Sequence, residues 1–177
     1  FNRIIAIRYM EVHEYLPERV NVLSSSVGRV DPDILFEYDT MDLAIKQEEV
    51  RELINTGNTE AAFRILFVAQ CNALNRILPF MFEPIQDYTE LLLPDFLLDA
   101  ESVIKTLVQN EELTESFSEI EVIGWLYQYY IAEEKDRVFA QKSKYKKEEI
   151  PFATQLFTPK WIVQYMVQNS LGRYWTE

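Results

Sequence analysis

Apolar side chains recur every three or four residues along most of this chain, and that spacing restricts the possible folds more than any other feature. In an α-helix this spacing places apolar side chains on one face, whereas a strand needs alternation with a period of two. No stretch alternates for long enough to predict a strand, and no internal repeat is present. We therefore predict an all-α fold, a multi-helix bundle packed around an aromatic-rich core.

Proline, glycine and capping residues divide this pattern into separate helices. The predicted helices span residues 2–16, 39–55, 59–78, 99–108 and a segment that begins at 118. Pro17 ends the first helix and Gly57 follows the second. Asn58 or Thr59 is expected to cap the third helix, and Asp99 the fourth. Ser118 and Glu121 fit the capping box S-x-x-E, which predicts the start of the fifth helix, "SEIEVIGWLYQYYIAEE".

The composition predicts a folded protein outside the membrane. Apolar residues make up 48% of 177 residues, which is enough for a packed core. No apolar run reaches the roughly 20 residues of a membrane span, and the first residues do not resemble a signal peptide. We expect a soluble, cytoplasmic chain. Because Phe1 already lies within a helical pattern, we also expect the chain to be a piece of a longer protein.

Catalytic and metal-binding residue types are scarce. Cys71 is the only cysteine and lies in an apolar run, which favours a small core residue in a reducing compartment over a reactive thiol. His13 is the only histidine, and we interpret it as a surface residue near a helix end. Four glycines occur singly, which does not match a phosphate-binding loop. We predict no metal site and no catalytic residue in this chain.

Charge is unevenly distributed along the sequence. The net charge of −12 argues against nucleic-acid binding by most of the surface, since phosphate contacts need Lys and Arg. Residues 135–147, "KDRVFAQKSKYKK", here called the basic run, hold six basic residues and one acid. This run is either a solvated linker or a strip that contacts phosphates. The lysines predicted to bind DNA in the second case are Lys142, Lys144, Lys146 and Lys147.

A Thr-Pro step near the carboxyl end predicts a helix start. A hydroxyl at the N-cap and a proline at the first helical position are both favourable, so we place Thr158 at the N-cap and Pro159 at N1. The amides of Lys160 and Trp161 would then point out of a helix end that carries positive partial charge. Such an end stabilises a carboxylate or a phosphate. Alternatively, Thr158 only caps its own helix.

At the Thr-Pro step, and in several earlier segments, the chain resembles a known family. The segment "TQLFTPKWIVQYMVQNSLGRYW" is similar to the segment that opens the S-adenosylmethionine-binding core of adenine-N6 DNA methyltransferases. Together with "EVIGWLYQYYIAEEKDRVFA", "FNRIIAIRYMEVHEYLP" and "ILPFMFEPIQDYTELLLP", it resembles the PglX-type methyltransferases of BREX phage-defence systems. The likeness is good over residues 1–17 and 118–175 and weak over residues 24–60. The family's cofactor loop, D-P-x-x-G-S-G, and its adenine-binding N-P-P-[YF] are absent.

The resemblance implies a role for the Thr-Pro step. It implies that Thr158 contacts the carboxylate of S-adenosylmethionine, that Phe157 and Pro159 shape that wall of the pocket, and that Gln155 helps to position it. Ile162, Val163, Met166 and Val167 would pack on the methyltransferase sheet that follows, although they could instead pack on neighbouring helices of this chain. The parent protein would methylate adenine in duplex DNA, and this chain alone would be inactive.

The resemblance also implies a division of the chain into three regions. Residues 1–117 would form a helical amino-terminal region, residues 118–150 a long helix and basic linker, and residues 151–177 the first helix of the methyltransferase core, cut short. Other phage-defence proteins are possible partners of the parent. A different class of function stays open: an acidic helical module that binds a protein or imitates DNA, supported by the net charge and by the 14% aromatic content.

Overall fold

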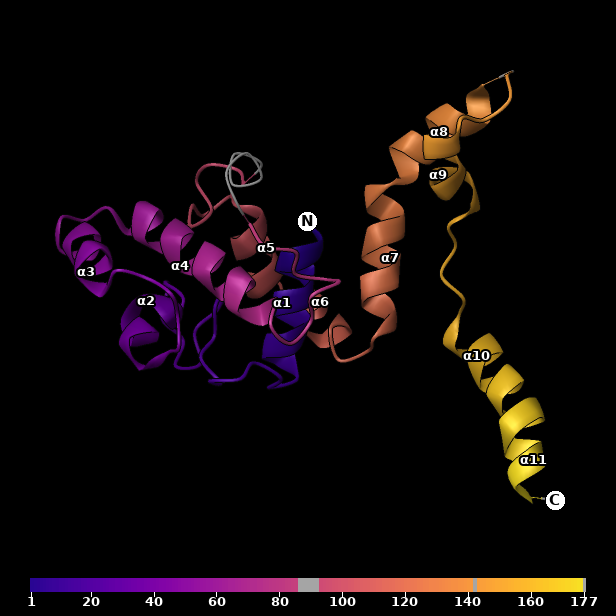
Figure 1. Ribbon diagram of the computed structural model, residues 1–177, viewed down its shortest axis with the longest axis horizontal. Helices are drawn as coiled ribbons and strands as arrows, with labels where there is room; N and C mark the ends of the chain where they lie inside the picture. Colours follow the sequence, from indigo (N-terminus) through magenta and orange to yellow (C-terminus); the bar gives the residue numbers. More distant parts are fainter. Residues whose placement is uncertain (86–92, 142, 177) are drawn as a thin grey trace. The chain divides into compact units, whose positions relative to one another are not determined.

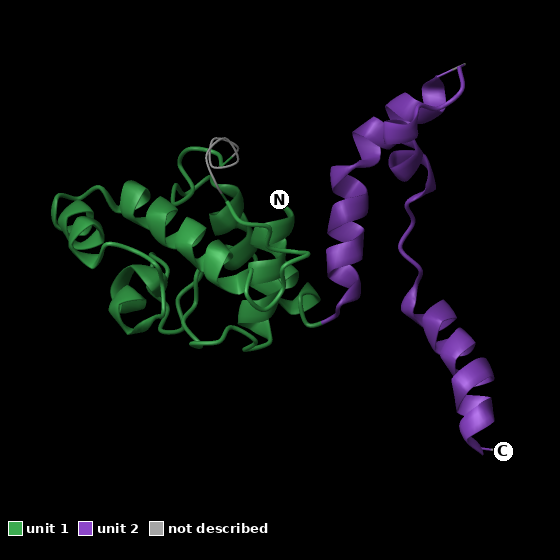
Figure 2. Ribbon diagram, in the orientation of Figure 1, with its two compact units in different colours: residues 1–118 green, residues 119–177 purple. Residues whose placement is uncertain are grey.

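The computed structural model describes residues 1–85, 93–141 and 143–176, and every regular element within these ranges is a helix (Figure 1). The prediction of an all-α fold is confirmed. The chain divides into two units, Phe1–Ser118 and Glu119–Glu177, here called unit 1 and unit 2 (Figure 2). Unit 1 carries the whole net charge of −12, because acidic and basic residues balance in unit 2.

Unit 1 is arranged around its longest helix, α4, which packs against α2 and α3. Asn58 caps α4 by accepting a hydrogen bond from the Ala61 amide, as one of the two predicted caps. The helices are shorter than the sequence pattern suggested, and α4 itself ends at Leu74 rather than continuing to Pro79. The elements of unit 1 are α1 (Asn2–Val12), α2 (Ile34–Glu37), η1 (Tyr38–Thr40), α3 (Gln47–Asn55), α4 (Thr59–Leu74), α5 (Val103–Gln109) and α6 (Glu111–Ser116).

The core of unit 1 is built on one face of α4. Phe63, Leu66, Phe67 and Leu74 recur at helical spacing and are fully or almost fully buried. Each such side chain contributes about 1.5–3 kcal/mol by leaving water. Cys71 lies on the same face, which confirms its interpretation as a core residue. Burial raises the pKa of the Cys71 thiol to about 12, so it stays protonated at neutral pH.

A buried polar network connects α1 to two later segments of unit 1. Arg8 pairs with Glu11 one turn away at 3.1 Å, and its other terminal nitrogen donates to Thr114 Oγ1 of α6 at 2.9 Å. Glu11 also accepts hydrogen bonds from the Leu23 amide and the Ser24 hydroxyl. Burial raises the pKa of Glu11, against the opposing effect of these donors. The network therefore holds two charges in the core by pairing them.

His13 lies at the end of α1, as the sequence predicted, but it is half-buried. Its Nε2 lies 2.9 Å from the Phe117 carbonyl, and its ring contacts those of Tyr9 and Tyr15. Because a carbonyl only accepts, Nε2 carries the proton in this contact. The histidine thus joins the two ends of unit 1.

The basic run begins inside one helix of unit 2 and ends at the first residue of the next element. The elements of unit 2 are α7 (Glu121–Tyr130), α8 (Ala132–Ala140), η3 (Lys147–Glu149), α9 (Ile150–Thr154), α10 (Lys160–Val167), the π-helical turn η4 (Gln168–Gly172) and α11 (Arg173–Thr176). The predicted single helix from 118 is interrupted at Ile131, between α7 and α8. The predicted capping box is wrong, because Ile120 is the N-cap of α7.

Three further boundaries predicted from the sequence were wrong. The second helix begins at Gln47 rather than at residue 39, after an extended Met41. The fourth is capped by Ser102, whose hydroxyl accepts from the Lys105 amide, and not by Asp99. The first ends at Val12, before Pro17 is reached. The Ser102 hydroxyl accounts for the observed start of the fourth helix, whereas Lys46, which precedes the second helix, makes no side-chain cap.

Candidate functional site

The Thr-Pro step and helix α7 are in direct contact within unit 2. The ring of Phe157 lies on Gly124, at a position where an added Cβ would be 2.5 Å from Cγ and 3.0 Å from Cε1 of the ring. The same ring meets the edge of Tyr127, with centroids 6.4 Å apart. Gly124 and Tyr127 are three residues apart and so share one face of α7. Two of the four segments that carry the family resemblance therefore pack on each other.

Two carboxylates at the start of α7 bind the first residue of α10. The Lys160 amide donates to Glu121 Oε1 at 2.7 Å, and Lys160 Nζ lies 2.7 Å from Glu119 Oε2. The hydrogen bond from Lys160 and its positive charge lower the pKa of Glu119. A carboxylate from α7 thus lies at the positive end of the α10 dipole.

The prediction that Thr158 caps α10 is wrong. Pro159 is the N-cap residue, with an extended ψ of 143°, and α10 begins at Lys160. The acceptor that a capping hydroxyl would supply comes instead from Glu121, which is 39 residues away in the sequence. In the described part of the chain, the Thr158 hydroxyl has no hydrogen-bond partner and Thr158 is exposed. The Trp161 amide likewise has no acceptor among the described residues.

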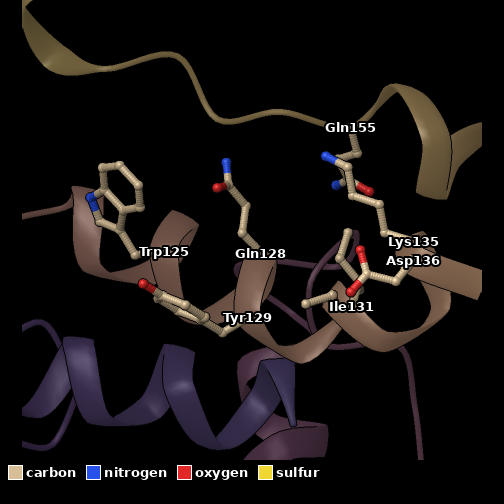
Figure 3. Close-up of a pocket in the computed structure, with 8 residues that line it drawn as sticks. Trp125, Gln128, Tyr129, Ile131, Lys135, Asp136 and Gln155 are labelled. Atoms are coloured by element: carbon tan, nitrogen blue, oxygen red, sulfur yellow. The ribbon is translucent and has the colours of Figure 1, made fainter. Parts of the chain in front are cut away.

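The four predicted cofactor-binding residues lie on the extended segment between α9 and α10. Phe157 packs on α7, Pro159 is half-buried, and Thr158 is exposed. Gln155 is half-buried and lines a cavity that α7 and α8 form on the other side (Figure 3). Sequence reasoning missed Glu119, Glu121 and Gly124. The spacing of three between Glu121 and Gly124, continued by Tyr127, was the available signal for this contacting face.

This arrangement can offer a small anion two donors. A carboxylate placed at the start of α10 could accept from the Thr158 hydroxyl and the Trp161 amide, which the chain leaves without partners in its described residues. The Lys160 amide is already engaged by Glu121. The helix end therefore offers an anion fewer free amides than the sequence suggested, and cofactor binding by these residues stays a prediction.

Among the described residues, none covers the apolar face of α10. Val163, Met166 and Val167 are exposed, and Ile162 is half-buried, so they do not pack on neighbouring helices as one of the two expectations held. Four large aromatic side chains of α10 and α11 are exposed as well: Trp161, Tyr165, Tyr174 and Trp175. Packing on a following sheet stays a prediction.

Glu149, two residues after the basic run, binds residues of the run, including the residue that follows α8. Glu149 accepts from the Gln141 side chain at 3.0 Å and from the Lys146 amide at 2.8 Å, and it lies 3.9 Å from Arg137. These hydrogen bonds, led by that from Gln141, lower the pKa of Glu149. Lys144, Lys146 and Lys147 are exposed. Lys142, the fourth predicted DNA contact, lies outside the described residues.

Two further features of the described residues bear on the class of protein. No group of three His, Cys, Asp or Glu residues in the described ranges is placed to hold a metal ion. Across the same ranges, no helix combines the length and the apolar character that crossing a bilayer requires.

Comparison with known proteins shows similarity along the whole chain. No protein-family model matches it. The chain is 45% identical over 181 residues to the adenine-specific methyltransferase BrxX of Escherichia coli O9:H4 (strain HS), with 100% of the chain covered. It is 46% identical over 190 residues to the adenine-specific methyltransferase PglX of Lacticaseibacillus casei (strain Zhang), with 99% covered. The chain spans 15% of the length of each relative. The resemblance to PglX-type methyltransferases is confirmed.

Proposed function

We propose that this chain is a helical part of an adenine-specific DNA methyltransferase of a phage-defence system. The parent protein would transfer a methyl group to adenine N6 in duplex DNA in the cytoplasm. S-adenosylmethionine would supply that methyl group when bound. The observation that carries the proposal is the identity of about 45% over the whole chain to two proteins that are both named adenine-specific methyltransferases.

Within that protein, the chain would supply a scaffold and one rim of the cofactor pocket. Thr158 and the Trp161 amide are the donors for the cofactor's carboxylate, and Phe157 and Pro159 shape the adjacent wall. Gln155 lies two residues before Phe157 and would help to position the same group. Support for this rim comes from the packing of Phe157 on α7, which fixes the segment that bears Thr158.

The chain alone would be inactive and would bind the cofactor negligibly. A helix end contributes only about 0.3–1 kcal/mol to binding a charged group at an exposed site. Glu121 already takes one of its amides, which reduces that contribution further. Calorimetric titration of S-adenosylmethionine into the 177-residue chain should therefore show no measurable heat of binding.

The proposal is tested in the parent protein. Purified parent should incorporate N6-methyladenine into duplex DNA when S-adenosylmethionine is supplied, and Thr158→Ala should weaken cofactor binding by about tenfold, as removal of one hydrogen bond to a charged group does. Thr154→Ala is the control, because Thr154 Oγ1 only donates to the Ile150 carbonyl within α9. No methylated adenine with wild-type parent would refute the function. Equal cofactor affinity of the two variants would refute the rim alone.

We also propose that the basic run binds DNA phosphates in the parent protein. Lys144, Lys146 and Lys147 are exposed, and they lie in the unit whose charges balance. Replacing them together with Lys142 by Gln should reduce the slope of log K against log salt by nearly one for each phosphate that the protein no longer binds. An unchanged slope would show that the basic run is a solvated linker.

An acidic interaction module remains the second candidate, and one observation favours it. Unit 1 concentrates the entire net charge of −12, which suits a basic partner rather than DNA. In a methyltransferase the same unit could dock another phage-defence protein, so the two functions are compatible. The test is to neutralise the carboxylates of unit 1 in the parent protein. If this variant methylates DNA at the wild-type rate but no longer pulls down such a partner, the parent has both functions, methylation and partner binding.

A further inference from the structure

Unit 2 contains a cavity of about 220 Å³ that shares one lining residue, Gln155, with the proposed cofactor rim. Helices α7 and α8 form one side of it, and the segment after α9 contributes Gln155 from the other side (Figure 3). The side chains that give it chemical character are Trp125, Gln128, Tyr129, Lys135, Asp136 and Gln155. A volume of this size exceeds that of one water molecule several-fold and suits a small planar group.

Two aromatic rings give the cavity a surface on which a flat molecule can stack. Trp125 and Tyr129 are four residues apart on α7, so they are neighbours on one face of the helix. Trp125 is 49% exposed and Tyr129 is 77% exposed, so their faces are not used up by core packing. Exposed aromatic rings of this kind stack on nucleobases in proteins that bind single strands.

The polar side chains of the cavity can recognise the edge of such a molecule. Gln128 and Gln155 each carry a donor and an acceptor, Asp136 is an acceptor and Lys135 a donor. Within the described residues, the side chains of Gln128, Asp136 and Gln155 form no hydrogen bond or ion pair with the protein. In Figure 3 the side chain of Lys135 extends from α8 toward the segment that carries Gln155. Unused donors and acceptors therefore face a stacking surface.

We propose that this cavity binds an unstacked nucleobase of DNA, specifically adenine or cytosine. The Watson–Crick edge of these two bases places an amino donor next to an unprotonated ring nitrogen, whereas that of guanine has a carbonyl oxygen next to N1–H. Adenine and cytosine present an amino donor beside a ring-nitrogen acceptor, which one Gln amide can read with two hydrogen bonds. Asp136 accepts from the amino group, whereas thymine would turn a carbonyl oxygen toward this carboxylate. Lys135 meets the phosphate that follows the base. The choice of DNA as ligand rests on the proposed function and on the balanced charge of unit 2.

The test uses the fluorescence of Trp125 in the full 177-residue chain. Trp161→Phe and Trp175→Phe remove the other two tryptophans, both of which are exposed. Single-stranded pentanucleotides with dA, dC, dG, dT or an abasic site at the centre, flanked by dT, are titrated into this variant. Central dA and dC should quench Trp125 and bind at least fivefold more tightly than central dT, dG or the abasic site.

A matched pair of glutamine variants isolates the role of the cavity. Gln155→Leu should weaken binding of the dA pentanucleotide about fivefold to tenfold, whereas Gln164→Leu on the exposed surface of α10 should leave it unchanged. Equal binding of the abasic and dA strands, no quenching, or no effect of Gln155→Leu would each overturn the inference. Methylation by the parent is a separate readout, so its success or failure distinguishes the proposed function from this site.

Discussion

The ring of Phe157 lies so close to Gly124 that a Cβ on this glycine would be 2.5 Å from Cγ of the ring. Gly124 is the fourth residue of α7, where glycine costs about 1 kcal/mol relative to alanine. Glycine therefore reduces the stability of α7 at this position. In return, the segment before α10 packs on α7 more closely than any other residue at position 124 would permit.

Gly124→Ala should release Phe157 from α7. The added methyl group overpacks the contact at a cost of about 1–3 kcal/mol, and the ring, which is 42% exposed, can swing into solvent. We expect faster hydrogen exchange at the Lys160 amide. In the double variant with Phe157→Ala the clash is absent, so alanine at position 124 should then stabilise α7 by about 0.5–1 kcal/mol. The same sign of effect in both backgrounds would contradict this packing.

Phe67→Ala should destabilise unit 1 by about 3–5 kcal/mol, because it leaves a cavity beside Phe63 in the fully buried face of α4. Phe80→Ala is the control, since Phe80 is 78% exposed and should cost less than about 0.5 kcal/mol. Urea unfolding followed by circular dichroism gives both values. Similar midpoints for the two variants would mean that Phe67 is not a core residue.

Arg8→Ala should cost about 3–5 kcal/mol, because it leaves the carboxylate of Glu11 buried without its ion-pair partner. Arg76 forms an exposed ion pair with Asp42, so Arg76→Ala should cost no more than about 1 kcal/mol. Thermal unfolding of the two variants tests the difference. A small decrease in stability for Arg8→Ala would show that Glu11 becomes protonated at little cost.

Asp33 should make unit 1 less stable in acid. Burial acts to raise its pKa, but hydrogen bonds from Ser26 and Ser25 outweigh burial and lower the pKa. A lowered folded pKa contributes stability that is present above the unfolded value of about 4 and is lost as the pH falls through the folded pKa. Asp33→Asn should therefore be less stable than wild type at pH 7, with the difference shrinking toward pH 3. A constant difference in urea unfolding across this range would exclude the carboxylate as the cause.

Local signals predicted the α4 cap and its buried face correctly, but they misplaced the starts of α3, α5, α7 and α10. Asn58 caps α4 because its acceptor and the Ala61 amide are three residues apart, and the buried face of α4 follows from its own periodicity. Thr158 and Ser118 failed as caps for one shared reason. Glu121, assigned to a capping box with Ser118, instead binds the Lys160 amide across 39 residues, and this removes the need for a hydroxyl at α10. The candidate rim depends on that long-range contact, which no short pattern encodes.

The carboxylate of Glu121 acts as a resident counter-ion for α10. If an incoming anion displaced Glu121 from the Lys160 amide, one negative charge would replace another. The electrostatic field at the start of α10 would therefore change little. The displaced glutamate, which is the first residue of α7 and lies four residues before Trp125, would release the Lys160 amide of α10. Anion binding at α10 would thereby change the contacts of α7. The fluorescence of Trp125, which lies on α7, would report that change.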